Sequence, residues 1–277
     1  VGGTRTGIGG SNNIPSDAVI VHGTQNVTEN YNITYENGLL KVIPRPITIT
    51  AASDTKVYDG TPLTNDKWIL SEETPLADNE NIASVTVDGS QTFVGTSANV
   101  ADKAVIKNAK NEDVTGNYEI TYENGTLEVT KASIAITITT DSNNKVYDGS
   151  ALTDDGYSLT AGTLATGDTI ASVTVEGSQT VKGTSDNVAS AAVIKHGETD
   201  VTDNYSISYV KGTLEVKERP ITITAASDWK YYDGKELTNK NWTLSEETPL
   251  AAGQSIDSVT VTGSQTLVGT SDNVPSA

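Results

Sequence analysis

The stretch Lys56-Val57-Tyr58-Asp59-Gly60 determines how this chain is organised, because it returns as Lys145-Val146-Tyr147-Asp148-Gly149 and as Lys230-Tyr231-Tyr232-Asp233-Gly234. A β-branched run precedes each copy and a Leu-Thr pair follows it, so a period of about 87 residues covers the chain. A repeat of this length has the size of a small domain rather than of one solenoid turn. The chain is therefore predicted to be an array of small domains.

Counting from this motif divides the 277 residues into two complete and two partial repeats. Residues 46–131 and 132–217 are complete, residues 1–45 match the second half of a repeat, and residues 218–277 match the first half. A second phase also fits, with residues 1–16 as an extra strand before repeats at 17–103, 104–190 and 191–277. In the first phase, we expect both partial repeats to expose unpaired strand edges that another copy could complete.

Short segments rich in β-branched and aromatic residues predict strands within each repeat. In the first complete repeat these segments are 47–50, 68–70, 84–87, 91–94, 104–107, 118–122 and 126–129. The last two alternate in polarity around Asn124-Gly125, which is typical of a hairpin with a type I′ turn.

Seven short strands in each repeat predict an all-β fold of tandem, small antiparallel β-sandwiches of immunoglobulin-like size. The alternative is a β-grasp-like domain with one short helix near residues 71–81. Few residues separate consecutive repeats, and Pro44, Pro46 and Pro220 restrict φ at two of the three joints. Such joints predict a rod with limited bending.

The charge of the chain excludes several classes of partner. Its 36 Asp and Glu outnumber 18 Lys and Arg, giving a formal net charge of -18. We therefore expect no nucleic-acid partner, since nucleic acids bind cationic surfaces. No apolar window is long enough to span a bilayer, so we also expect no direct membrane insertion.

Catalytic signals are missing from the sequence. The chain has no cysteine, which removes disulfides and thiolate chemistry. Its two histidines, His22 and His196, stand in matching loops and are expected to lie in solvated turns. No Ser-His-acid set stands out among the many Ser and Thr residues. We therefore expect no enzyme, no catalytic residue and no cofactor.

Several further segments accompany the Lys-Val-Tyr-Asp-Gly motif in a fixed order. They are an Ile-Thr run before it, Val-Gly-Thr-Ser-Ala-Asn-Val at 94–100 and Val-Thr-Gly-Asn-Tyr-Glu-Ile-Thr-Tyr-Glu-Asn-Gly-Thr-Leu-Glu-Val at 114–129. Together with Lys-Val-Tyr-Asp-Gly-Thr-Pro-Leu-Thr at 56–64, they resemble the MBG and YDG-type repeats. Those repeats occur in tandem in large surface proteins of bacteria, often Gram-positive and anchored to the cell wall.

The resemblance covers essentially the whole chain and implies a non-catalytic, extracellular stalk on a bacterial cell surface. Any cell-wall anchor would lie outside these residues. The implied partners are neighbouring repeats or other copies of the chain. Two alternatives remain open: an adhesin that binds host glycan or mucin, and a filament subunit that assembles head-to-tail by strand complementation. Trp229 is the candidate for glycan stacking, because the other repeats have Thr55 and Asn144 at its position.

The Tyr-Asp-Gly core itself has the composition of a turn, since Asp can bond backbone amides and Gly tolerates positive φ. A more specific hypothesis is an isopeptide bond between lysine and asparagine, assisted by an aspartic acid, as in some Gram-positive surface domains. Its candidates are Lys56, Asp59 and Asn117 in one repeat, and Lys145, Asp148 and Asn204 in the next.

Calcium is a further hypothesis, because hard carboxylate oxygens suit this ion and aspartates recur near one end of the domains. No EF-hand or similarly spaced loop accompanies them. The candidate ligands are Asp54, Asp59, Asp141, Asp148 and Asp228.

Overall fold

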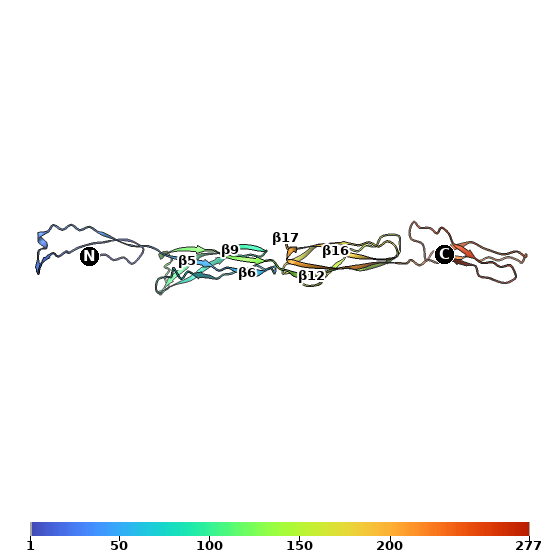
Figure 1. Cartoon of the computed structure of the whole chain (residues 1–277), viewed down its shortest axis with the longest axis horizontal. Coiled ribbons are helices and arrows are strands. Elements are labelled where there is room, and N and C mark those ends of the chain that lie inside the picture. Colours follow the sequence, from blue (N-terminus) through green and yellow to red (C-terminus); the bar gives the residue numbers. More distant parts are fainter. Residues whose placement is uncertain (1, 277) are drawn as a thin grey trace. The chain divides into compact units, whose positions relative to one another are not determined.

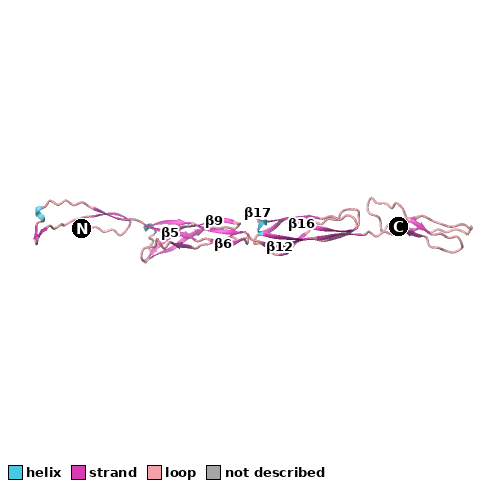
Figure 2. Ribbon diagram, in the orientation of Figure 1, coloured by secondary structure: helices cyan, strands magenta, loops and turns pink. Residues whose placement is uncertain are grey.

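The computed structural model describes residues 2–276, and its regular elements are almost all strands (Figures 1 and 2). The helical elements of the described residues are three single 3-10 turns, η1 (Thr28–Asn30), η2 (Thr115–Asn117) and η3 (Thr202–Asn204). The prediction of an all-β fold is confirmed. The β-grasp alternative is wrong, because residues 71–79 form turns and loop instead of a helix.

The chain divides into two compact units, residues 1–132 and 133–277. The strands of the first unit are β1 (Gly9–Asn13), β2 (Val21–His22), β3 (Gln25–Asn26), β4 (Gly38–Val42), β5 (Arg45–Ala51), β6 (Asp54–Val57), β7 (Trp68–Leu70), β8 (Glu80–Asp88), β9 (Gly95–Asn108), β10 (Tyr118–Glu123) and β11 (Gly125–Thr130).

The second unit begins with the complete repeat, β12 to β19, and ends with the partial repeat, β20 to β23. Its strands are β12 (Ile134–Thr140), β13 (Asn143–Val146), β14 (Tyr157–Ala161), β15 (Asp168–Glu176), β16 (Gly183–His196), β17 (Thr199–Asp200), β18 (Tyr205–Val210), β19 (Gly212–Lys217), β20 (Ile223–Ala225), β21 (Trp242–Leu244), β22 (Thr260–Thr262) and β23 (Val274–Ser276).

The first complete repeat consists of two sheets with strand orders β10-β5-β7 and β6-β11-β9-β8. One core cluster takes buried side chains from both sheets, including Ile47 and Ile49 of β5 and Ile106 of β9. Removing such side chains from water is the main stabilising contribution to a small domain without disulfides. Strands β5 and β10 run parallel, as do β6 and β11.

The first and last strands of this repeat change sheet together. β5 gives way to β6 in the other sheet at the same level as β10 gives way to β11. At this crossing a Cβ on Gly125 would lie 2.3 Å from the carbonyl oxygen of Ala52, a distance that no side chain tolerates. The crossing therefore requires glycine for close backbone approach.

The predicted hairpin at Asn124-Gly125 is wrong for this reason. Strand β10 pairs with β5, whereas β11 pairs with β6 and β9, so the two predicted hairpin strands lie in different sheets. Of the other predicted strands, the segment 91–94 is also wrong. Gln91 forms only an isolated bridge with Leu63, and the long strand β9 begins after this segment. Strand β6 was not predicted.

The second complete repeat has the same construction, with sheets β14-β12-β18 and β13-β19-β16-β15. Tyr205 lies opposite Ile134 and Val216 opposite Lys145, as Tyr118 lies opposite Arg45 in the first repeat. Strand pairing thus stays within residues 45–130 and within 134–217. The boundaries of the second predicted phase, after residues 103 and 190, fall inside β9 and β16.

The two partial repeats are far less buried. β1 pairs with β4 in the register Gly9 to Val42, which matches that of Gly95 to Val129 in the complete repeat. The predicted extra strand within residues 1–16 thus belongs to this half-repeat. No residue between 2 and 45 is buried, and only Ala251 and Val261 are buried in the described part of 218–276. Among the described residues, no helix has the length and apolar character that crossing a membrane requires.

Candidate functional site

The Lys-Val-Tyr-Asp-Gly motif forms an ion-paired turn at the end of β6. Lys56 Nζ donates to Asp59 Oδ1 at 2.7 Å and to Thr61 Oγ1 at 2.8 Å. The amide and hydroxyl of Thr61 both donate to the same aspartate oxygen at 2.8 Å. Gly60 follows Asp59 with φ of 81°, a conformation that favours glycine. The motif is thus the turn expected from its composition.

This turn fixes the charge state of its aspartate. The hydrogen bond from Lys56, followed by those from the Thr61 amide and hydroxyl, lowers the pKa of Asp59 to about 2. Hydrogen bonds from Lys145 and Ser150 likewise lower the pKa of Asp148 in the second repeat. An acid that assists an isopeptide bond must accept and release protons, and a strongly ionised surface carboxylate is poorly suited to that task.

The structure does not bring the lysines and asparagines of the isopeptide hypothesis together. Lys56 lies opposite Val129 near the end of the β6–β11 pair, whereas Asn117 precedes Tyr118, which lies opposite Arg45 at the start of the β5–β10 pair in the other sheet. The intervening stretch of extended chain spans roughly 35 Å. The second repeat separates its two candidates in the same way, because Lys145 lies opposite Val216 and Asn204 precedes Tyr205, which lies opposite Ile134.

The aspartates of the calcium hypothesis also remain apart. Within residues 2–276, no group of three or more His, Asp or Glu residues is arranged to hold a metal ion. Asp59 and Asp148 instead pair with the lysines of their own turns. Asp54 accepts from the amide of Thr55, and Asp228 accepts from the amide of Trp229, both at 2.8 Å.

A buried polar cluster in the second repeat was missed from the sequence. Both oxygens of the fully buried Asp168 side chain are engaged, Oδ1 by His196 Nδ1 at 2.8 Å and Oδ2 by the Tyr205 hydroxyl at 2.6 Å. Burial, followed by the bond to Asp168, raises the pKa of Tyr205 to about 12. The cluster ties β15 and β16 to β18, and Glu80 and Tyr118 make the equivalent bond in the first repeat.

His196 therefore does not lie in a solvated turn as expected. His196 is the last residue of β16, and its side chain is only 26% exposed. The alternation of His22 and His196 with Asn108 at this position was the one signal in the sequence that could have pointed to the cluster. Because Asp168 bonds both His196 and Tyr205, the cluster has a structural role and holds β15, β16 and β18 together.

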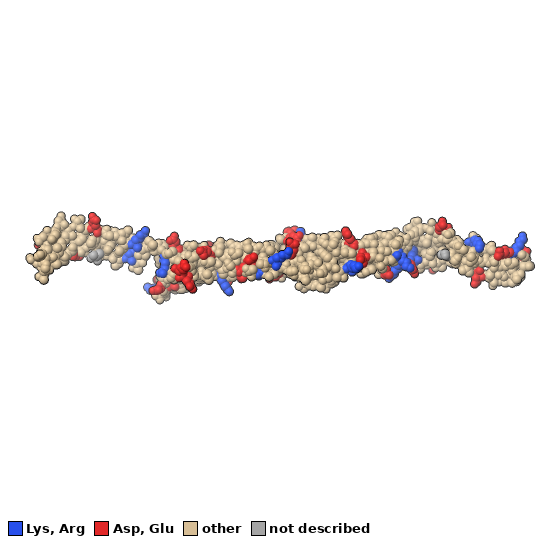
Figure 3. Space-filling model, viewed as in Figure 1, with Lys and Arg blue, Asp and Glu red and all other residues tan. Residues whose placement is uncertain are grey.

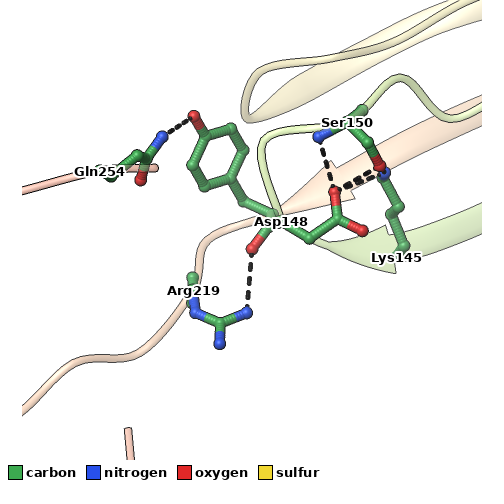
Figure 4. Close-up of polar contacts among 6 residues, drawn as sticks. Lys145, Asp148, Ser150, Arg219 and Gln254 are labelled. Carbon is green, nitrogen blue, oxygen red and sulfur yellow. Dashed lines mark hydrogen bonds and ion pairs between the residues drawn. The ribbon is translucent and has the colours of Figure 1, made fainter. Parts of the chain in front are cut away.

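The Tyr-Asp-Gly turn of the second repeat is also a contact surface (Figure 4). The carbonyl oxygen of Tyr147 accepts a hydrogen bond from the Arg219 guanidinium at 3.4 Å, and its hydroxyl accepts one from Gln254 at 2.5 Å. Arg219 Nε donates in turn to the carbonyl of Pro249 at 2.6 Å. The turn thus holds the beginning of the following partial repeat, a role that its composition did not indicate.

The C-terminal partial repeat encloses a cleft of about 1030 Å³. Residues 228–232 line one wall and residues 263–275 another. In the complete repeats, the segments equivalent to these two walls lie on either side of β11 or β19. Trp229 lies on its wall with 75% of its surface exposed, its ring edge-on to Tyr231 at 5.7 Å between centroids.

The comparisons with known proteins supply no relative. No family model, curated protein or solved structure matches the chain. The resemblance to MBG and YDG-type repeats therefore stays a prediction carried by the motifs at 56–64, 94–100 and 114–129. Any function rests on the geometry of the repeats themselves.

Proposed function

We propose that this chain is a non-catalytic stalk segment of a bacterial extracellular surface protein, built from small β-sandwich repeats of immunoglobulin-like size. The observation that carries the proposal is the parallel pairing of the first and last strands in each complete repeat. Because these strands run in the same direction, the chain enters a repeat at one end and leaves it at the other. Each repeat then adds its own length to the molecule.

The side chains that recur between repeats support a structural role. Lys56 and Lys145 make the same ion pair, and Asn99 and Asn187 donate to the same pair of backbone carbonyls in their respective repeats. These contacts join strands and loops within a domain. These noncovalent contacts stabilise a chain that has no cysteine for disulfides.

The surface charge suits a spacer outside the cell. On the face drawn in Figure 3, acidic side chains are dispersed among neutral ones and no continuous basic patch is present. The net charge of -18 opposes non-specific association with other molecules. Neighbouring repeats and further copies of the chain are the partners that we propose.

The test is deletion of residues 45–131, which removes one complete repeat and joins Pro44 to Ala132, so that four residues separate Val42 from Ile134 as they separate Val129 from Ile134 in the intact chain. For stiffly joined repeats, we expect small-angle X-ray scattering to show a maximum dimension shorter by roughly 40 Å, the length of about 12 extended residues. The remaining complete repeat should melt at an unchanged temperature. A broad, freely jointed ensemble before and after the deletion would contradict the stalk proposal.

One observation favours a second candidate function, glycan or mucin binding. Trp229 and Tyr231 form an exposed aromatic pair that the other repeats lack. Glycan arrays and immobilised mucin, probed with the chain and with Trp229→Ala, separate the two functions. Saturable binding that Trp229→Ala abolishes would favour the adhesin, whereas no binding by either protein favours the stalk.

A further inference from the structure

The second complete repeat has an unprotected strand at the edge of its sheet β14-β12-β18. Strand β14 pairs with β12 on one side, and among the described residues no strand pairs with its other side. All five of its residues, Tyr157–Ala161, are exposed. The backbone amides and carbonyls that point away from β12 are therefore available to a further strand.

The equivalent edge of the first complete repeat is protected. Strand β7 has only three residues, Lys67 precedes it, and Glu72, Glu73 and Pro75 follow shortly after it. Charged residues and proline at a strand edge oppose pairing with another chain. In the second repeat, residues 156–167 contain no charged residue and no proline, and β14 extends to five residues. The unprotected edge is therefore a property of the second repeat and not of the fold.

The distribution of charge indicates which partner this edge accepts. The net charge of -18 makes two copies of the chain repel each other over most of their surface, so an uncharged edge is where they can approach. Asp154 and Asp155 are the acidic residues just before β14. In an antiparallel pairing centred on Leu159, they would face Leu164 and Thr163 of the second copy. A parallel pairing in register would instead place each aspartate beside its own counterpart, so the antiparallel arrangement avoids like charges directly opposite each other.

We infer that β14 pairs antiparallel with β14 of a second copy of this chain, so that two β14-β12-β18 sheets join across a two-fold axis. The inference rests on the proposed structural function and names the surface through which two copies meet. Two-fold pairing brings the same residue of each copy together at its centre, so Leu159 would lie opposite Leu159. Backbone hydrogen bonds supply the contact. Because only five residues of each chain pair, we expect the association to be reversible.

The first test uses a single cysteine, because the chain has none of its own. Leu159→Cys places the two cysteines of a pair opposite each other, with their Cα atoms about 4.5–5.5 Å apart and within the reach of a disulfide. The control is Ile69→Cys in the middle of β7, where the native side chain is 64% exposed. Pairing raises the effective concentration of the thiols. Under mild oxidation, we therefore expect Leu159→Cys to form covalent dimers at least about tenfold faster than the control.

A charge at the same position provides an independent readout by sedimentation. Leu159→Lys places two like charges directly opposite each other, while the aliphatic part of lysine covers the surface that leucine covered. We expect the average mass of the unmodified chain to rise toward that of a dimer with concentration. Leu159→Lys should abolish the rise, and Ile69→Lys, at the protected edge, should leave it unchanged. Calorimetry of Leu159→Lys checks that residues 132–217 still fold.

Three results would overturn the inference: equal rates of crosslinking in the two cysteine variants, an unmodified chain whose mass does not rise, or a mass that rises equally in Leu159→Lys. Each of them would leave the stalk proposal standing, because that proposal is tested by the repeat deletion.

Discussion

The buried asparagine of each repeat gives the sharpest test of what holds the domain together. Asn187 is fully buried in β16, and its amide nitrogen donates to the carbonyls of Asp141 at 3.0 Å and Asp154 at 2.9 Å. Asp141 follows β12, at the point where the chain crosses between sheets, and Asp154 lies in the next loop. One side chain therefore fixes two loops against a central strand. Asn187→Ala removes both bonds.

The expected magnitude follows from these bonds. Two buried carbonyls left without a donor cost about 2–4 kcal/mol. The carbonyl oxygen of the Asn187 side chain is buried and has no hydrogen-bond partner among the described residues. Removing it therefore restores about 1 kcal/mol of the free energy of unfolding. The net loss of about 2 kcal/mol should lower the melting temperature of this repeat by roughly 10–15 °C, given the size of one domain.

Differential scanning calorimetry of the full chain measures this shift directly. We expect the transition of residues 132–217 to move below that of residues 46–131, and Asn99→Ala to move the other transition instead. Asn144→Ala is the matched control, because it removes only an exposed bond from Lys217. If Asn187→Ala shifts the melting temperature no more than Asn144→Ala does, the asparagine does not hold the loops and the reasoning fails.

Three further predictions concern the strand crossing, the turn and the contact between turn and partial repeat. Gly212→Ala should lower the stability of its repeat by more than about 2 kcal/mol in calorimetry, because the new Cβ would lie 2.2 Å from the Asp141 carbonyl; Gly116→Ala, with open space around it, should change little. The pKa of Asp59 is about 2 in the folded state and 3.8 ordinarily, so its ion pair stabilises the fold above pH 4 and loses that effect between about pH 4 and 2. Asp59→Asn should therefore flatten the fall in melting temperature over this window, whereas Asp66→Asn, at an exposed site, should not. Arg219→Ala should speed amide hydrogen exchange in residues 249–254, measured by mass spectrometry, because it removes the bonds to Tyr147 and Pro249; unchanged exchange would show that this contact does not order the segment.

Local sequence was sufficient for the element types and for the turn. The β-branched run at 47–50 and the Trp-Ile-Leu segment at 68–70 form strands β5 and β7, because β-branched and aromatic side chains favour a pleated, half-buried surface. The Lys56 motif forms a turn because its residues make hydrogen bonds to one another. In both cases the deciding interactions lie within a few positions of each other.

Which strands pair with one another could not be predicted from local sequence. The alternation on both sides of Asn124 suits a hairpin, yet the strand partner of Leu127 is Asp54, far away in the chain. Gly125 was taken for a residue with positive φ, whereas its role is to let the Ala52 carbonyl approach. The separation of the lysines and asparagines of the isopeptide hypothesis was likewise invisible in the sequence, since only the strand register places Lys56 in the β6–β11 pair and Asn117 before the β5–β10 pair.

The parallel pairing of first and last strands has a mechanical consequence. When tension draws the two ends of a complete repeat apart, β5 and β6 are pulled one way while β10 and β11 are pulled the other. The hydrogen bonds between them are then loaded in shear and must fail together, whereas an antiparallel hairpin pulled at its open end unzips one bond at a time. A repeat connected in this way resists stretching most strongly along the direction in which it extends the chain.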